Sequence, residues 1–404
     1  MGDAMNELAS VALILLLSLL AGHLVKFLRI PEVTGYILAG IIVGPSVLGW
    51  INEQNLTSLS VFSEIALALI LFSIGSIFEF GHFRSIGRSV VRITALECFS
   101  TAILVTLATL AAGEPWRIAV LLGVVAMETG AASTLMVIRE YNAQGPFTQA
   151  LTGVIAINNL FCLGSFLLVT AVLQLTGSFG SSGINVYQIL YTILWQLLGS
   201  IALGYLVGLL LAAWCTKVVE HGETLILLIG CVLLCAGVSL VLDLSTLVVS
   251  LTLGATTANF SANTGRLARV QSRTDPPFYA VFFVIAGAHL QLGLLKSLGV
   301  VGLAYILGRA IGKIGGGYAG ARLAQLPDEF RGRMGFGLMA HAGLAIGLVL
   351  SLTKRFPNLG AELSTIVLGA ILVYEIAGPV SVRNVLLRSG ESQARTANAL
   401  EVLE

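Results

Sequence analysis

The chain has 404 residues, of which 56% are hydrophobic and 11% are charged, and its formal net charge is +1. Because a soluble domain averages about 25% charged residues, this composition excludes a soluble globular protein. The balanced charge, with no basic tail, also argues against a nucleic-acid partner. Apolar runs of about 20 residues recur along the whole chain, each long enough to cross a hydrocarbon core of about 30 Å, so we expect an all-α polytopic protein of the lipid bilayer.

Thirteen apolar segments follow one another, and the connections between them are too short for a sizeable soluble domain. They cover residues 8–28, 32–50, 58–78, 88–112, 115–138, 148–175, 187–214, 223–240, 243–262, 277–295, 297–323, 333–352 and 361–387. The first is predicted to be a retained span, because the residues before it lack the basic region of a cleaved signal. We therefore expect one transmembrane unit over residues 1–388 and a short, polar, frayed cytoplasmic tail over 389–404.

The basic residues are unevenly divided between the two sides of the membrane. When successive loops are assigned to alternate sides, sixteen Lys and Arg residues fall on one side and four on the other. The positive-inside rule then places the N-terminus outside and the C-terminus in the cytoplasm. The two remaining basic residues, Arg309 and Lys313, lie inside the eleventh segment.

Two segments are interrupted by small and polar residues near the middle of the membrane. The fifth contains METGAAST (127–134), and the twelfth contains MAHAGLAIG (339–347). Broken backbone at this depth is tolerated only where it is buried in protein or lines a cavity. The breaks stand seven segments apart, which fits an inverted repeat of helices 1–6 and 8–13, so we predict that helices 5 and 12 are discontinuous and cross. Close packing explains the small residues in these segments but does not explain Glu128 or His341.

The sixth segment carries two adjacent amides, Asn158 and Asn159, deep in its apolar run. Burying an unpaired amide costs roughly 1–3 kcal/mol, so each of the two needs a partner. Two interpretations are open. The amides satisfy backbone groups that nearby helix breaks set free, or they bind an ion directly.

Several motifs, in the same order along the chain, resemble those of bacterial monovalent cation/proton antiporters, the group that contains Na+/H+ and K+/H+ antiporters. They are IPEVTGYILAGIIVGPSVLGWI (30–51), TLMVIREYNAQGP (134–146), FFVIAGAHLQL (282–292) and GRAIGKIGGGYAGARL (308–323). The resemblance implies thirteen helices, divided into a dimerisation subdomain and a mobile core subdomain of helices 4–6 and 11–13. It also implies a homodimer of the bacterial inner membrane that exchanges Na+ or K+ for protons without a cofactor.

Members of this family usually carry Asp-Asp or Asn-Asp in helix 6, and the second Asp binds either the cation or the proton. Asn158 and Asn159 occupy these positions here, and the resemblance matches Arg309 to the basic residue of helix 11. A buried carboxylate can alternate between the two ligands, because it binds a cation when ionised and is neutral when protonated. An amide oxygen can bind a cation, but it has no proton to exchange near pH 7. The two amides alone therefore cannot exchange protons.

Four other acids lie within or near the apolar segments, and they are Glu64, Glu97, Glu128 and Glu375. Intramembrane acids are the default candidates for a proton site. Glu128 is the first candidate, because it adjoins the proposed break of helix 5, beside Thr129, and helix 6 follows closely. Glu64 and Glu97 are further candidates, although each could instead pair locally, and Glu375 is interpreted as structural.

Arg309 would be costly to bury without an acid, and Glu128 is the first candidate for that partner. Lys313 lies one turn further along the same helix face. A permanent ion pair of Glu128 with Arg309 or Lys313 would stop Glu128 from titrating, and this alternative stays open. His341, in the break of helix 12, is expected opposite helix 5, where a contact with Glu128 would place a group that titrates near neutrality at the centre of the transporter. The other interpretation of His341 is a neutral imidazole that bonds freed backbone.

The favoured function is a monovalent cation/proton antiporter with a non-standard ion site, formed by Asn158, Asn159, Glu128 and Thr129. The alternative is an uncoupled ion or solute transporter, or a channel-like protein, on the same scaffold. A member that senses or assembles without transport, and an introduced Asp-to-Asn change in helix 6, are further alternatives. The sequence holds no intramembrane protease motif, so an enzyme is not expected. No metal beyond the transported cation is expected, because the five cysteines lack convincing metal spacing and are interpreted as free thiols.

Overall fold

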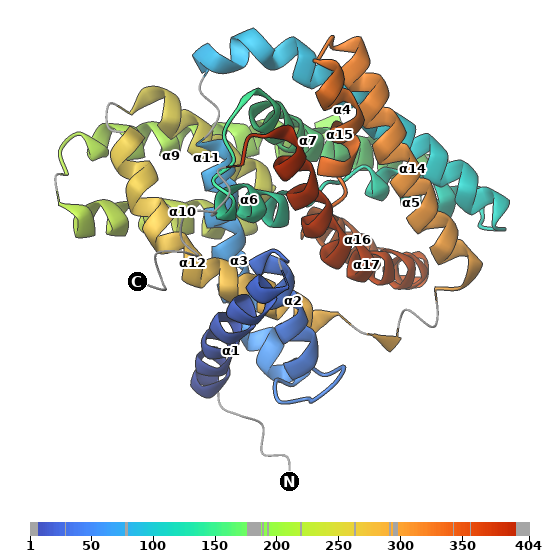
Figure 1. Ribbon diagram of the computed structural model, residues 1–404, viewed down its shortest axis with the longest axis horizontal. Helices are drawn as coiled ribbons and strands as arrows, with labels where there is room; N and C mark the ends of the chain where they lie inside the picture. Colours follow the sequence, from blue (N-terminus) through green and yellow to red (C-terminus); the bar gives the residue numbers. More distant parts are fainter. Residues whose placement is uncertain are drawn as a thin grey trace.

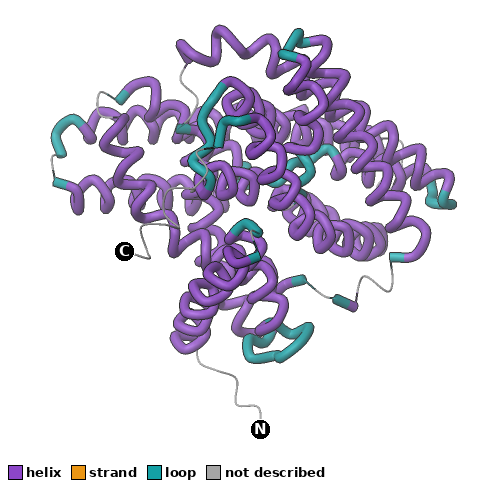
Figure 2. Tube along the Cα trace, viewed as in Figure 1, coloured by secondary structure: helices purple, strands orange, loops and turns teal. Residues whose placement is uncertain are grey.

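The computed structural model describes residues 7–28, 30–76, 80–175, 187, 190–191, 194–218, 220–261, 264–290, 292–293, 298–341, 343–355 and 357–392. These residues form α-helices joined by loops, with one π-helical turn and no β-strand among them (Figure 2). The predicted all-α fold is confirmed. In the described part of the chain, seven helical stretches are long and apolar enough to cross a membrane, and three shorter apolar helices accompany them.

Each of the thirteen predicted segments contains a helix, and the fifth and twelfth contain two helices each. In chain order the elements are α1 (Glu7–Phe27), α2 (Glu32–Val43), α3 (Glu53–Gly75), α4 (Phe80–Ala111), α5 (Trp116–Ala126), α6 (Ala131–Glu140), α7 (Pro146–Leu175), the π-helical η1 (Trp195–Gly199), α9 (Ser200–Cys215), α10 (His221–Val241), α11 (Thr246–Phe260), α12 (Thr264–His289), α14 (Gly299–Leu323), α15 (Asp328–Gly337), α16 (Gly343–Arg355) and α17 (Pro357–Ser389).

Several helix boundaries differ from those that hydropathy predicts, and two of them have a clear cause in the sequence. The second segment is predicted over 32–50, but α2 ends at Val43, because Gly44 is extended and is followed by Pro45, which has no backbone N–H to donate. Helix α12 begins at Thr264, well before the predicted start at 277. Its first turns are too polar to give a hydropathy signal.

The helices pack in two groups (Figure 1). One group contains α4 to α7 and α14 to α17, and the other contains α1 to α3 and α9 to α12. Contacts between the groups come mainly from α2 and α3 against α6 and α17. At the end of α6, Arg139 pairs with Asp275 of α12, and the Glu140 carboxylate accepts a hydrogen bond from the N–H of Glu32 at 2.8 Å. The dimerisation and movement of these groups, and the inverted repeat, stay predictions.

Helices α4 and α14 lie side by side because glycines on α14 let the two backbones approach closely (Figure 1). A Cβ on Gly312 would lie 2.5 Å from the Cα of Thr101. A Cβ on Gly316 would lie 2.8 Å from the Cα of Glu97. These distances leave no room for a side chain, as in other close-packed membrane helices. The contact sets the position of Lys313, between the two glycines, relative to α4.

The fifth and twelfth spans are both broken, and their breaks meet. Residues 127–130 separate α5 from α6, and the described residues 338–341 lie between α15 and α16. The backbone N–H of Gly130 donates to the carbonyl of Ala340 at 2.9 Å, which joins one break to the other. The prediction of two crossed, discontinuous helices is confirmed.

The start of the predicted tail is docked rather than frayed. The Glu391 carboxylate accepts hydrogen bonds from the N–H groups of Phe147 and Thr148, each at 2.7 Å, and from the Thr148 hydroxyl at 2.7 Å. These are free donors at the N-terminus of α7, where a negative charge is favoured. Glu391 therefore caps the helix that carries the amide pair. Residues 393–404 of the predicted tail lie outside the described residues.

Candidate ion site at the helix crossing

Arg309 of α14 ties the two helix breaks together. Its guanidinium is fully buried and donates to four backbone carbonyls. The acceptors are Ala126 at 3.2 Å, Met339 at 2.8 Å, Glu128 at 2.7 Å and Ala340 at 2.8 Å. These carbonyls lie at or just after the C-terminal ends of α5 and α15, where the last carbonyls lack helical partners and the helix dipole is negative. The positive charge is thus stabilised by backbone.

The sequence favours the Glu128 carboxylate as the partner of Arg309, whereas the hydrogen bonds of Arg309 in the structure go to backbone carbonyls. Arg309 contacts the backbone oxygen of Glu128, and the face of its guanidinium lies over the ring of Tyr374 at 4.3 Å. A buried guanidinium needs compensating negative charge or hydrogen-bond acceptors, which an acid would normally provide. Two broken helices supply enough carbonyls to take the place of that acid, because the break frees them from the helix ladder.

The Glu128 carboxylate is held by His341, as the crossing arrangement predicts. Glu128 Oε2 and His341 Nδ1 lie 2.7 Å apart, and His341 Nε2 lies 2.9 Å from the hydroxyl of Tyr305. All three side chains are buried. The Glu128 carboxylate, the imidazole and the Tyr305 hydroxyl thus form one chain of contacts at the centre of the crossing.

Lys313 pairs with Glu97 of α4 rather than with Glu128. Both side chains of this ion pair are fully buried. The Lys313 ammonium also donates to the carbonyl of Met127 at 2.5 Å and to the hydroxyl of Thr129 at 2.8 Å. The lysine therefore links α4 to the break that follows α5, and it brings Thr129 into the same network.

The two amides have different surroundings. Asn158 Nδ2 donates to Glu97 Oε2 at 2.9 Å and to the carbonyl of Met127 at 2.8 Å, with the sulfur of Cys98 at 3.1 Å. Asn159 Nδ2 donates only weakly, to the carbonyl of Ile155 on its own helix at 3.3 Å. In the described part of the chain, neither side-chain oxygen has a hydrogen-bond partner. The nitrogen of Asn158 thus bridges a helix break, while both oxygens are left for another ligand.

Glu97 is the residue whose importance the sequence did not rank. It was one of four intramembrane acids, and nothing in the sequence separated it from Glu64. The structure separates the two acids, because Glu64 lies exposed on α3 and shares no hydrogen bond or ion pair with the described crossing residues. Glu375 is buried on α17, and it follows Tyr374, over whose ring the Arg309 guanidinium lies, in the sequence. The glycines of α14 could have indicated the importance of Glu97 from the sequence, because glycines on one helix face predict a close contact, and this contact brings Lys313 against α4.

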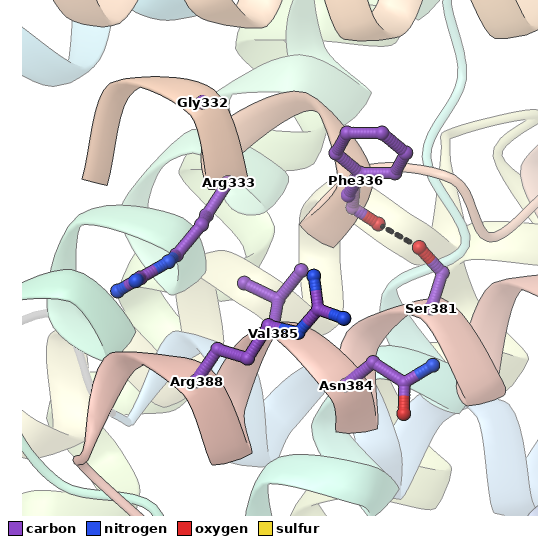
Figure 3. Close-up of a pocket in the computed structure, with 7 residues that line it drawn as sticks. All are labelled: Gly332, Arg333, Phe336, Ser381, Asn384, Val385 and Arg388. Carbon is purple, nitrogen blue, oxygen red and sulfur yellow. Dashed lines mark hydrogen bonds between the residues drawn. The ribbon is translucent and has the colours of Figure 1, made fainter. Parts of the chain in front are cut away.

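A cavity of about 300 Å³ lies between α15 and α17 (Figure 3). Its lining residues are Gly332, Arg333, Phe336, Ser381, Asn384, Val385 and Arg388. The Ser381 hydroxyl donates to the carbonyl of Phe336 at 2.8 Å across this space. None of the lining residues belongs to the network around Arg309 and Lys313, so this cavity is separate from the candidate ion site.

Comparison with known proteins gives a match to the transmembrane sodium/hydrogen exchanger family over residues 12–388. Sequence relatives include the iron transporter MagA of Paramagnetospirillum magneticum, with 30% identity over 22% of this chain and 20% of that one. The ammonium/H+ antiporter subunit AmhT of Alkalihalophilus pseudofirmus is 24% identical over 59% of each chain. The Na+/H+-K+ antiporter GerN of Bacillus cereus is 43% identical over 16% of each chain. The matched segments thus span 59% or less of the length of these relatives.

Among solved structures, the sodium proton antiporter MjNhaP1 from Methanocaldococcus jannaschii has the same fold. Its TM-score is 0.78 at 14% identity, over 96% of this chain and 99% of that chain.

Proposed function

Because the chain belongs to the sodium/hydrogen exchanger family, we propose that it is a secondary active transporter that exchanges a monovalent cation, Na+ or K+, for protons across a bacterial inner membrane. The ion site is non-standard, since it lacks the helix 6 aspartate that the family usually carries. We further propose that the chain works as a homodimer.

The observation that carries the proposal is a cluster of four buried charged side chains at the crossing of two broken helices. They are Glu97, Glu128, Arg309 and Lys313. Charged groups at this depth are expensive, and they mark ion or proton pathways in membrane proteins. When His341 is neutral, the two negative charges of the glutamates and the two positive charges of Arg309 and Lys313 sum to zero. A proton or a monovalent cation bound to one ionised acid then adds the same single charge, which is the condition for the two ligands to replace each other.

Each residue of the site has a role in this proposal. Asn158, Asn159 and Thr129 offer uncharged oxygen atoms, which suit a hard cation. Arg309 holds the two breaks in place, and Lys313 provides a fixed positive charge.

The pair formed by Glu128 and His341 stores a proton beside the site, in contact with Tyr305. From the sequence, Glu128 is also the first candidate for the acid that exchanges the cation for the proton.

The test is transport by purified protein in lipid vesicles that enclose a pH-sensitive dye. Pulses of NaCl or KCl should change the internal pH, and equal pulses of choline chloride should not. Tracer cation flux without any pH change would overturn the proposal and support an uncoupled transporter on the same scaffold. Absence of both signals would support a member without transport.

A further inference from the structure

We infer that Glu97 of α4 is the carboxylate at which the cation and the proton compete. It takes the place of the aspartate that this family usually carries in its sixth span, which is α7 in this chain. The inference rests on the proposed antiport and names its central residue. The cation site that it implies lies between α4 and α7, beside Lys313 of α14.

Asn158 and Lys313 both contact the carboxylate of Glu97. Asn158 Nδ2 donates to the Glu97 carboxylate at 2.9 Å, and Lys313 pairs with the same carboxylate. The Glu128 carboxylate is held by His341 at 2.7 Å. Among the described residues of the crossing, Glu97 is therefore the acid that joins Asn158 to the buried lysine.

Three buried oxygen atoms near Glu97 have no hydrogen-bond partner among the described residues. Asn158 Oδ1 and Asn159 Oδ1 belong to α7, which packs against α4, and Thr101 Oγ1 belongs to α4 on the side that meets Gly312 of α14. Thr101 lies one turn after Glu97 on α4, so the two side chains share a helix face. Buried polar atoms normally have partners. Hard cations prefer oxygen ligands, and a monovalent cation between α4 and α7 would supply the missing partner.

Lys313 keeps hydrogen-bond acceptors when Glu97 becomes neutral. Its ammonium also donates to the Met127 carbonyl at 2.5 Å and to the Thr129 hydroxyl at 2.8 Å. Removing one partner of a buried ion pair is costly when the other charge is left alone. Here the ion pair can open while the lysine retains two oxygen acceptors, so Glu97 is free to bind a ligand.

The charges balance in this exchange. In the described structure, the titratable and charged side chains that face Glu97 are Lys313 on α14, Cys98 on α4 and Cys162 on α7, with Glu128 beyond the end of α5. The ionised Glu97 carboxylate takes up one proton on one side of the membrane. On the other side it releases that proton and binds one monovalent cation, so one proton moves for each cation.

The test compares Glu97→Gln with Glu128→Gln in the vesicle assay, with Glu223→Gln as the matched control. Glu223 is an exposed acid at the start of α10, in the other helix group. We expect Glu97→Gln to lose cation-driven proton movement by about tenfold or more, because the amide has no proton to exchange. Glu128→Gln should lower it by a smaller factor than Glu97→Gln does, because Glu128 belongs to the proposed site but an amide oxygen in its place still accepts the hydrogen bond of His341. Glu223→Gln should match the wild type.

Exchange at the wild-type rate in Glu97→Gln, with none in Glu128→Gln, would overturn the inference and favour Glu128 as the exchanging acid. A wild-type protein that moves no protons with any cation would instead overturn the proposed function, so the two failures can be told apart.

A second variant decides the case in which Glu97→Gln does not fold, or in which both single variants are inactive. The double variant Glu97→Gln/Asn159→Asp returns one carboxylate to the amide pair. Recovered exchange supports the inference, and a folded double variant without exchange overturns it. Glu97→Asp keeps the charge but shortens the side chain. We expect a weaker apparent cation affinity by about fivefold, because cation sites depend on ligand geometry, and an unchanged affinity would contradict the inference.

Discussion

Lys313 of α14 and Glu97 of α4 form an ion pair whose two side chains are completely buried at the helix crossing. Asn158 of α7 donates to the same carboxylate at 2.9 Å. The contact connects the most unusual feature of the sequence, two adjacent asparagines in a membrane helix, with an acid on a different helix. A carboxylate is therefore present beside Asn158, although it comes from α4 and not from α7, the helix that carries the amide pair.

Replacing Lys313 tests whether this ion pair is buried as described. We expect Lys313→Met to lower the free energy of unfolding by about 3–5 kcal/mol, because the Glu97 charge is left without its counter-charge. The double variant Lys313→Met/Glu97→Gln removes both charges and should recover most of that loss. Thermal unfolding of the detergent-solubilised protein measures both effects. A single variant as stable as the wild type would show that the pair is solvated.

Replacing Arg309 tests its role as the link between the two helix breaks. The guanidinium donates to four carbonyls, and a lysine ammonium in its place cannot reproduce that planar fork. We expect Arg309→Lys to destabilise the protein by about 2–4 kcal/mol, because buried carbonyls lose charged donors. Hydrogen exchange at residues 126–130 should rise in this variant. Unchanged exchange there would mean that other groups hold the breaks together.

The sequence predicted the crossing but not the pairing of its charges. The motifs METGAAST and MAHAGLAIG interrupt apolar runs, and such interruptions report directly on broken helices, so the contact of Glu128 with His341 followed. The partners of Arg309 and Lys313 depend on how α14 is rotated against α4 and on which carbonyls the breaks set free. Neither of these features can be predicted from the sequence of one helix alone, because both depend on how several helices pack together. The same limit explains why Glu97 was not separated from Glu64.

The glycines of α14 provide a paired test of the contact with α4. A Cβ on Gly316 would lie 2.8 Å from the Cα of Glu97, whereas a Cβ on the adjacent Gly315 would meet no atom within 4 Å. We expect Gly316→Ala to destabilise by about 1–3 kcal/mol through overpacking. Gly315→Ala should be neutral or stabilise by up to about 1 kcal/mol, because alanine favours the helix. Thermal unfolding compares the two, and equal effects would contradict the close approach.

Glu391 provides a test of how α7 is anchored. Its carboxylate caps the first N–H groups of this helix. We expect Glu391→Ala to destabilise by about 1–2 kcal/mol, as loss of an N-terminal cap does elsewhere. Amide hydrogen exchange should increase at Phe147 and Thr148. The neighbouring Ser392→Ala serves as the control, since the structure shows no hydrogen bond from Ser392 to α7, and an equal response in both variants would refute the cap.

The most direct measurement of the central claim is proton release when a cation binds to the purified protein in weakly buffered detergent solution. Competition at one carboxylate requires that NaCl or KCl, but not choline chloride, releases protons, up to about one per chain. The account predicts this release in the wild type and in Glu128→Gln, and none in Glu97→Gln. Cation binding without proton release in the wild type, or undiminished release in Glu97→Gln, would contradict it.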